Sequence, residues 1–322
     1  MSTLSPEQRA WFAESFTKLV ANVEQVVLGK RHVIELAFTA MVAEGHLLLE
    51  DMPGTGKTSL ARAMGKSVQG VSTRIQFTPD LLPGDVTGMT VYDQRKAEFE
   101  FHAGPIFANV VLADEINRAS PKTQSALLEA MEERQVTVDG VTRQTGAPFL
   151  VVATQNPVEQ AGTYRLPEAQ LDRFLLKTSL GYPDHATTVR ILEASGSKAP
   201  ELHPVMTLQG VLEMIELAKG VFIDPLVMDY IVRIVEATRN ATQVRLGASV
   251  RAALGLTRAA KVWALAHERD FVTPDDVKGL AEVTLAHRLV LDPEAEFEGV
   301  TAGAVIGQIL LDTKPPTQGA EG

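Results

Sequence analysis

The chain has 322 residues, a formal net charge of −10, 45% hydrophobic and 22% charged residues, and no cysteine. This length is enough for about two globular domains, and the composition excludes wholesale disorder. Disulfides, thiolate metal sites and a cysteine nucleophile are excluded. The acidic balance argues against nucleic acid as a partner, because phosphate backbones attract clustered lysine and arginine.

The beginning of the sequence bears on the compartment. Residues 1–7 lack the basic and apolar regions of a secretory signal. No uninterrupted apolar run approaches the roughly 18 residues that a membrane span requires. We therefore expect a cytoplasmic protein without a membrane span.

The first half of the chain alternates between two kinds of pattern. Ser5, with Pro6 and Gln8 behind it, predicts a first helix that ends near Gly29. Beyond it, short apolar runs alternate with helical patterns, which predicts an α/β fold with a parallel sheet and right-handed crossovers. The five predicted strands are residues 46–50, 73–77, 110–113, 149–153 and 174–179.

Two segments interrupt this alternation, and both are predicted to be hairpins inserted into the α/β core. Residues 81–101 contain two short β-like runs around a charged tip. Residues 135–145 contain Asp139-Gly140, which is a strong signal for a two-residue hairpin turn. Such inserted hairpins project from the core, where a partner would meet them.

From about residue 184 the strand patterns stop and capped helices follow, for example after Thr207 and Asp224. We therefore predict a core with its N-terminal helix over 1–185 and an all-helical domain over 186–312. The remaining residues, 313–322, are rich in Pro, Gly and Thr and are predicted to be disordered.

The strongest motif is a glycine-rich turn between a strand and a helix. Its glycines allow a concave backbone with free N–H groups that can hold phosphate, and the following helix adds a partial positive charge. Lys57 can reach the β and γ phosphates, and the Thr58 hydroxyl can bind Mg²⁺. Asp51 stands where the first glycine of such motifs is usual. The predicted nucleotide-binding residues of this turn are Pro53, Gly54, Thr55, Gly56, Lys57, Thr58 and Ser59.

Two further strands end in polar side chains. An apolar run delivers Asp114 and Glu115 to the carboxyl end of its strand, where ligands bind in open α/β sheets. Asp114 is predicted to hold Mg²⁺ through water, and Glu115 to polarise the attacking water. Asn156 follows another apolar strand and can hydrogen-bond this water or the γ-phosphate, although Asn before Pro157 is also typical of a simple turn.

In this order the motifs resemble those of AAA+ ATPases, and specifically those of the MoxR family. The matching segments are LLEDMPGTGKT (48–58), DEINRA (114–119), QSALLEAMEE (124–133), ATQNP (153–157) and LPEAQLDRF (166–174). The resemblance implies a P-loop αβα sandwich with a five-stranded parallel sheet, followed by a helical lid. The strand before Asn156 would lie between those of Lys57 and Asp114, and residues 81–101 and 135–145 would be the helix-2 insert and the pre-sensor-1 hairpin.

The resemblance also implies roles for single residues. Asn156 resembles sensor 1, and Arg173 resembles the arginine finger that enters a neighbouring subunit's site. Arg251 resembles the lid arginine that contacts the γ-phosphate in cis. Val27 and Gly29 lie where the family's adenine pocket begins. By contrast, the pair after Met131, Glu132-Glu133, is predicted only to be a solvated helix end.

The implied function is an ATP- and Mg²⁺-dependent ring ATPase, a homo-oligomer and by family expectation a hexamer. It would act as a chaperone that remodels or matures client proteins or inserts their cofactors or metals. Its implied partners are these clients and proteins with a von Willebrand factor A-like domain. A magnesium-chelatase-like motor subunit and an ATP-gated scaffold with little turnover are alternatives, and the intact Glu115 argues against the scaffold.

Overall fold

The computed structural model of the protein describes residues 4–52, 54–156, 164, 166–194 and 200–316. Pro53, which is one of the predicted nucleotide-binding residues, lies outside the described residues, as do residues 317–322 of the predicted tail. In the described part of the chain, no helix combines the length and the apolar character that crossing a membrane requires.

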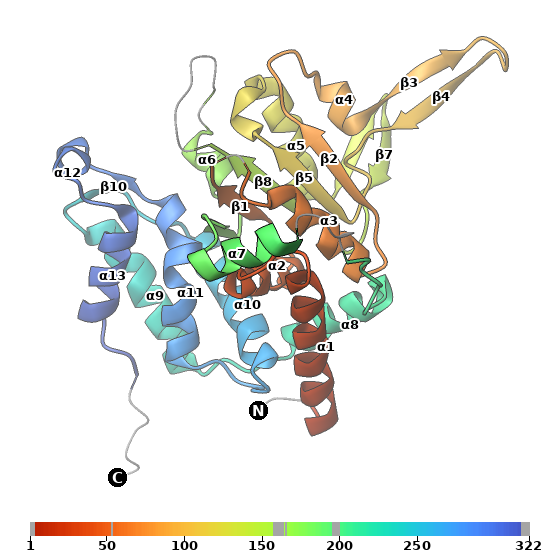
Figure 1. Cartoon of the computed structure of the whole chain (residues 1–322). Helices are drawn as coiled ribbons and strands as arrows, with labels where there is room; N and C mark the ends of the chain where they lie inside the picture. Colours follow the sequence, from red (N-terminus) through yellow and green to blue (C-terminus); the bar gives the residue numbers. More distant parts are fainter. Residues whose placement is uncertain (1–3, 53, 157–163, 165, 195–199, 317–322) are drawn as a thin grey trace.

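A five-stranded parallel sheet forms the centre of the N-terminal half (Figure 1). The prediction of five strands is confirmed, with boundaries that differ by at most two residues. The strand before Asn156 also lies between the two other motif strands, as the resemblance implied. In sheet order the strands are β2 (Ser72–Gln76), β5 (Val110–Asp114), β8 (Leu150–Gln155), β1 (Leu47–Glu50) and β9 (Leu176–Thr178).

Helices cover both faces of this sheet, so its strands are apolar on both sides. Alternate residues of a strand point to opposite faces: Val110 and Leu112 join one hydrophobic cluster, whereas Val111 and Ala113 join the other. The first cluster also contains residues of the lid, so core and lid share a continuous apolar contact. The first cluster holds α1 (Pro6–Glu24), α2 (Arg31–Val42) and α3 (Lys57–Ser67), and the second holds α5 (Pro121–Glu133).

The N-terminal helix begins as predicted and ends earlier. Ser5 and Gln8 form the expected capping box of α1. The helix ends at Glu24, whereas the sequence patterns placed its end near Gly29. The chain turns first, because the N–H groups of residues 26 and 27 both bond to the carbonyl of Val23. Gly29 has a φ of +67° and belongs to the following turn into α2.

Both predicted hairpins are present. The first, β3 (Gly88–Asp93) with β4 (Glu98–Ala103), projects far from the sheet (Figure 1), and a short helix that was not predicted, α4 (Pro83–Thr87), precedes it. The second pairs β6 (Gln135–Val138) with β7 (Val141–Gln144) around the expected turn. Phe99 on β4 is 74% exposed, so this hairpin offers an apolar side chain near its charged turn.

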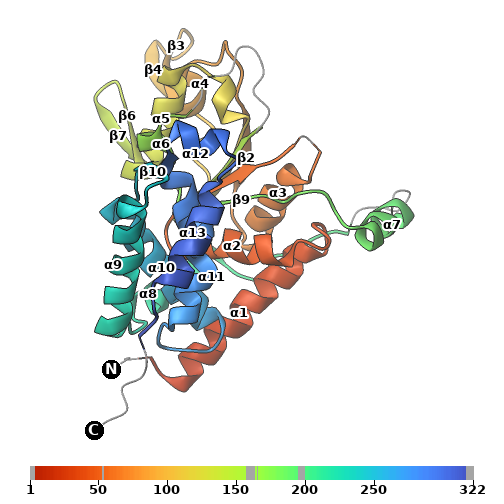
Figure 2. The same ribbon diagram turned by 90° about the vertical axis from the view of Figure 1, so that its left-hand side faces the viewer.

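The C-terminal half is a helical domain, and Figure 2 shows its helices stacked against α1 and below the sheet, with α7 (His185–Ala194) to one side. The expectation that strands stop after residue 184 needs a correction, since β10 (Val244–Leu246) pairs with β11 (Val290–Leu291). Two antiparallel loops between helices thereby satisfy their backbone groups. The main helices are α8 (Leu208–Lys219), α9 (Pro225–Asn240), α10 (Val250–Ala266), α11 (Pro274–Leu285), α12 (Pro293–Phe297) and α13 (Ala302–Asp312).

A buried histidine joins the sheet to α5. His46, just before β1, accepts a hydrogen bond from the Val151 N–H at Nδ1 (3.0 Å), and its Nε2 donates to the Met131 carbonyl (3.0 Å). This pattern requires the neutral imidazole, because a proton on Nδ1 would break the bond from Val151. Burial, above all, lowers the pKa of His46 to about 4.

Because its folded pKa is lowered, His46 makes the free energy of unfolding decrease as the pH decreases. The unfolded imidazole titrates near 6.5, so between about pH 6.5 and 4 the unfolded chain binds a proton that the folded chain does not. At pH 5 the loss for His46 is about 2 kcal/mol relative to pH 7. We expect His46→Asn to flatten the decline by that amount in denaturant unfolding at the two pH values. Equal declines in the two proteins would contradict this assignment.

Candidate nucleotide site and arginine cluster

The parallel sheet brings the predicted catalytic residues to one edge. Because all five strands run in the same direction, their carboxyl ends meet there. The turn that leads to Lys57 follows β1, Asp114 ends β5, and Asn156 follows β8, which lies between them. Residues from three distant parts of the chain therefore meet at the carboxyl edge.

The glycine-rich turn has the backbone that a phosphate site needs. Gly54 and Gly56 have φ values of +86° and +98°, and a Cβ on either would meet no atom within 4 Å. Glycine is thus required by conformation, and the turn faces open space. The Lys57 ammonium donates to the carbonyls of Asp51 (3.1 Å) and Met52 (3.2 Å). The open turn, the lysine and the N-terminus of α3 together fit a polyphosphate.

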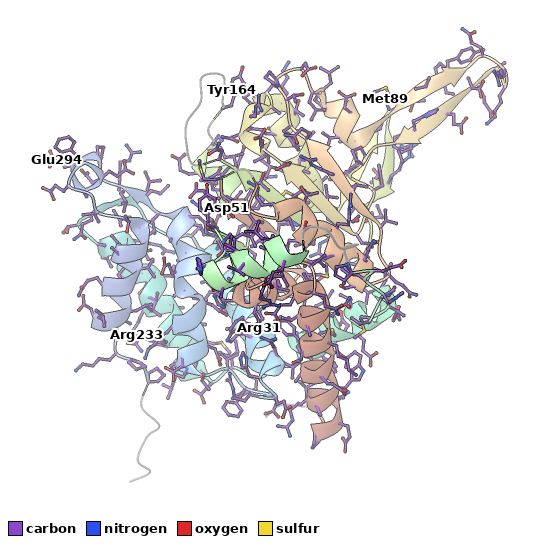
Figure 3. All side chains as sticks on the ribbon, in the orientation of Figure 1. Arg31, Asp51, Met89, Tyr164, Arg233 and Glu294 are labelled. Atoms are coloured by element: carbon purple, nitrogen blue, oxygen red, sulfur yellow. The ribbon has the colours of Figure 1, made fainter. Side chains whose placement is uncertain are left out.

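Asp51, which departs from the usual glycine, anchors the start of this turn. It is buried near the centre of the molecule (Figure 3), and its carboxylate accepts the N–H groups of Leu180 (2.6 Å) and Gly181 (2.8 Å). The Ser179 hydroxyl also donates to it, at 3.1 Å. The carboxylate thereby ties the turn to the segment after β9, a role that nothing in the motif could reveal.

The two acids at the end of β5 are held in different ways. Asp114 is buried and accepts hydrogen bonds from Thr154 Oγ1 (2.7 Å) and Arg74 Nη2 (2.7 Å). Glu115 has a left-handed backbone with φ of +56°, which costs roughly 1–2 kcal/mol and is typical of functional sites. Its carboxylate accepts from Arg118 (2.8 Å) and from Gln76 (3.1 Å).

Thr154 was not predicted as a site residue. Its hydroxyl, fully buried on β8, donates to Asp114 and also accepts the Glu115 N–H at 2.9 Å. One side chain thus positions both acids. The available signal was a hydroxyl in an otherwise apolar strand. Arg74 was missed as well, because only the sheet order shows that β2 lies next to β5.

The residues at this edge fit a magnesium–nucleotide complex better than a metal site made of protein alone. Within the described ranges, no group of three or more His, Asp or Glu side chains could hold a metal ion. Magnesium usually takes only one or two protein ligands and fills its sphere with water and phosphate oxygens. Thr58, at the start of α3, and Asp114 would supply those ligands, and this role stays a prediction.

The two residues predicted to begin the adenine pocket, Val27 and Gly29, pack against different parts of the chain. Val27 is buried in the hydrophobic cluster shared with the lid. Gly29 packs so closely on α7 that a Cβ there would lie 2.7 Å from the Thr187 hydroxyl. Lys30 Nζ donates to the Tyr182 carbonyl (2.8 Å), which connects this region to the segment that Asp51 anchors. Contact of Val27 and Gly29 with adenine stays a prediction.

The two predicted arginines lie at the opposite edge. Arg173 precedes β9 and Arg251 begins α10, and both contact Glu132 at the end of α5. This end of α5 lies at the amino edge of the sheet, since the Met131 carbonyl bonds to His46 before β1. The start of α10 thus lies beside Arg173, across the sheet from Lys57. This position does not favour contact of Arg251 with the γ-phosphate in cis, and the role of Arg251 stays a prediction.

The segment that carries Arg173 is bound to the lid on both sides. Asp172 accepts from the Ser249 hydroxyl (3.2 Å) and forms an ion pair with Arg288 (3.2 Å). The Phe174 carbonyl accepts from Arg288 Nη2 (2.7 Å). Arg173 Nη1 itself donates to the backbone carbonyl of Leu128 (2.7 Å). A shift of the lid would therefore move the backbone of Arg173.

Comparison with known proteins agrees with this arrangement. Residues 46–176 match the model of the ATPase family associated with various cellular activities (AAA), and residues 236–309 match that of the AAA lid domain. Chaperone MoxR1 of Mycobacterium tuberculosis is 40% identical over 93% of this chain and 82% of its own. The chain belongs to the MoxR family of AAA+ ATPases.

Two further proteins are similar over nearly the whole chain. The uncharacterized protein YeaC of Bacillus subtilis is 50% identical over 94% of this chain and 95% of its own. A crystal structure of a protein assigned as an ATPase from Cytophaga hutchinsonii has a TM-score of 0.91 and 39% identity, and covers 97% of this chain and 98% of that one. Membership in this family assigns ATP hydrolysis to the protein.

In this MoxR-family ATPase, Thr154 should matter to stability and turnover alike. Thr154→Val keeps the shape but removes the hydroxyl, leaving a buried Asp114 oxygen and the Glu115 N–H unpaired. We expect the free energy of unfolding to fall by about 1–3 kcal/mol, together with slower ATP turnover. Thr154→Ser should retain both, as measured by denaturant unfolding and phosphate release. Wild-type turnover in Thr154→Val would contradict the positioning role.

Proposed function

We propose that the protein works as an ATP-driven homo-oligomeric ring whose active sites form between subunits. The observation that supports this is the position of Arg173 and Arg251 at the amino edge, across the sheet from Lys57 and Glu115. A subunit then carries two half-sites that face different neighbours. Such head-to-tail contacts form a ring when the rotation closes, and a hexamer is the family expectation.

Each residue has a defined task in the proposed site. Lys57 and the N–H groups of the turn hold the β and γ phosphates, while Thr58 and Asp114 hold Mg²⁺, which neutralises phosphate charge. Glu115 accepts a proton from the attacking water, and Asn156 orients that water. Arg173 and Arg251 of the next subunit stabilise the charge that develops in the transition state.

We further propose that turnover moves the lid and the projecting hairpins so as to remodel client proteins. Residues 172–174 link the arginine to the lid, so a change in its phosphate contact shifts the balance between lid positions. The exposed Phe99 on the first hairpin offers an apolar contact for a client. A relative named as a chaperone supports this role. Proteins with a von Willebrand factor A-like domain are the proposed partners.

Separating binding from turnover tests the nucleotide site and the client role together. Glu115→Gln should bind ATP with unchanged affinity, lose turnover, and retain client protein on affinity capture with ATP more than without it. Lys57→Ala is the control and should lose both nucleotide binding and ATP-dependent capture. Normal turnover in Glu115→Gln would exclude it as the base, and unchanged ATP affinity in Lys57→Ala would remove the phosphate site.

Mixing inactive subunits tests the shared site. Arg173→Ala should lower turnover on the order of 10³-fold, the lower end of what an arginine finger contributes. Mixed one to one with Lys57→Ala, it should regain activity, since about a quarter of the interfaces in a ring would join an intact Lys57 to an intact Arg173.

A one-to-one mixture of Arg251→Ala with Lys57→Ala distinguishes action of Arg251 across the interface from action in cis. Recovery of phosphate release indicates action across the interface, whereas Arg251 acting in cis gives none, because Lys57 and Arg251 would then have to be intact in one subunit. Absence of recovery for Arg173→Ala at every mixing ratio would contradict the proposed shared site.

A further inference from the structure

Glu132, which the sequence suggested was only a solvated helix end, contacts two arginines from distant parts of the chain. Its Oε2 lies 3.1 Å from Arg173 Nη2, and its Oε1 accepts a hydrogen bond from Arg251 Nη2. The adjacent Glu133 is also exposed but makes no ion pair or hydrogen bond with any described residue. The contact is therefore specific to one of two neighbouring acids.

The surroundings of Glu132 carry an excess of positive charge. Arg134 is paired with Glu44 (2.5 Å) and Arg288 with Asp172 (3.2 Å). These two acids are thus occupied, and among the acids of the described residues only Glu132 pairs with Arg173 and Arg251. The hollow of about 160 Å³ beside it is lined by three acids, Glu44, Glu132 and Asp172, and by five arginines, Arg134, Arg173, Arg251, Arg258 and Arg288.

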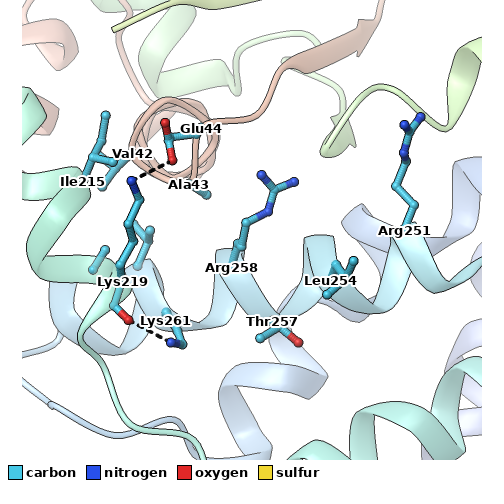
Figure 4. Close-up of a pocket in the computed structure, with 12 residues that line it drawn as sticks. Val42, Ala43, Glu44, Ile215, Lys219, Arg251, Leu254, Thr257, Arg258 and Lys261 are labelled. Carbon is cyan, nitrogen blue, oxygen red and sulfur yellow. Dashed lines mark hydrogen bonds and ion pairs between the residues drawn. The ribbon is translucent and has the colours of Figure 1, made fainter. Parts of the chain in front are cut away.

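Arg258 adds to this excess. It projects from the same side of α10 as Arg251 (Figure 4), and within the described ranges its guanidinium has neither a hydrogen bond nor an ion pair. Burial lowers the pKa of Arg288 to about 10, and repulsion from Arg258 and Arg251 acts in the same direction despite the attraction of Asp172. The cluster therefore holds more positive charge than its own acids neutralise.

We propose that Glu132 is a positioning residue that holds Arg173 and Arg251 side by side, as one anion-binding pair aimed at the polyphosphate bound by the neighbouring subunit. This inference rests on the proposed function, in which both arginines act across the interface. Glu132 itself touches neither the nucleotide nor the attacking water.

The physical case has two parts. Long arginine side chains have many rotamers, and two like charges repel, so without a shared carboxylate the pair would separate and lose its common direction. A guanidinium carries five N–H donors, and each arginine gives Glu132 only one of its terminal nitrogens. Arg173 gives a further donor, on Nη1, to the Leu128 carbonyl. The other donors of the two guanidiniums are available to phosphate oxygens while the carboxylate still fixes the orientation.

The chain offers a matched pair of variants for the test. Glu132→Gln keeps the size of the side chain but removes its charge, and Glu133→Gln makes the same change one residue away. We expect Glu132→Gln to lower kcat about tenfold at saturating ATP and at protein concentrations where the wild type is assembled. The ATP affinity of the subunits and the thermal midpoint should match those of Glu133→Gln, whose turnover should equal the wild type. Glu132→Asp should recover part of the rate.

A double variant separates positioning from a general structural effect. If Glu132 acts through the two arginines, then Glu132→Gln should lower kcat by a smaller factor in Arg251→Ala than in the wild type, because only its contact with Arg173 remains to be lost. Fully multiplicative losses would overturn the proposal. So would a kcat of Glu132→Gln at or above the wild-type value, the higher value meaning that the carboxylate restrains the arginines.

The outcomes also separate this inference from the proposed function. If Arg173→Ala and Arg251→Ala slow turnover but Glu132→Gln does not, the arginines act as proposed and only the role of Glu132 fails. If neither arginine variant slows turnover, the shared active site itself is contradicted.

Discussion

The parallel pairing of five strands is the constraint on which the rest of the structure depends. A parallel sheet has two different edges, because all carboxyl ends lie on one side and all amino ends on the other. The carboxyl edge holds the glycine-rich turn, Asp114, Glu115 and Asn156. The amino edge holds the C-terminal end of α5, the N-terminal end of α10 and the segment before β9. The acids and the arginines are therefore kept apart within one subunit.

Single side chains complete each edge. Thr154 binds both Asp114 and the backbone of Glu115, so the two acids keep a constant spacing. Asp51 ties the phosphate turn to the chain that leaves β9. At the other edge, Glu132 joins the two arginines. Each of these residues is a polar group that serves several partners at once, which makes its contacts more specific than a single ion pair.

The lid is connected to the segment that carries Arg173 through backbone as well as side-chain hydrogen bonds. Asp172 and Phe174, on either side of Arg173, bond to Ser249 and Arg288 of the C-terminal domain. The apolar cluster that spans α1, the sheet and the lid makes this connection stiff, because packed interiors transmit displacements. If Arg173 contacts the nucleotide of a neighbouring subunit, as we propose, a change at that nucleotide reaches the lid of the subunit that carries Arg173 through a short path.

Signals close together in the chain predicted much of this protein. The phosphate turn, the acids at the end of an apolar strand, the Ser5 capping box and the Asp139-Gly140 hairpin all depend on residues a few positions apart. Strand alternation then predicted the fold class, and the family resemblance implied that the strand before Asn156 lies between those of Lys57 and Asp114.

Other features depend on contacts between distant residues, which one sequence does not contain. Thr154 with Asp114, Arg74 with Asp114, and Glu132 with Arg251 join positions that the sheet and the lid bring together. The small strand pair β10–β11 arises in the same way. Local patterns thus determined which chemical groups the chain carries. Only tertiary packing decided which groups meet, because the placement of α10 against the amino edge depends on the whole shared core.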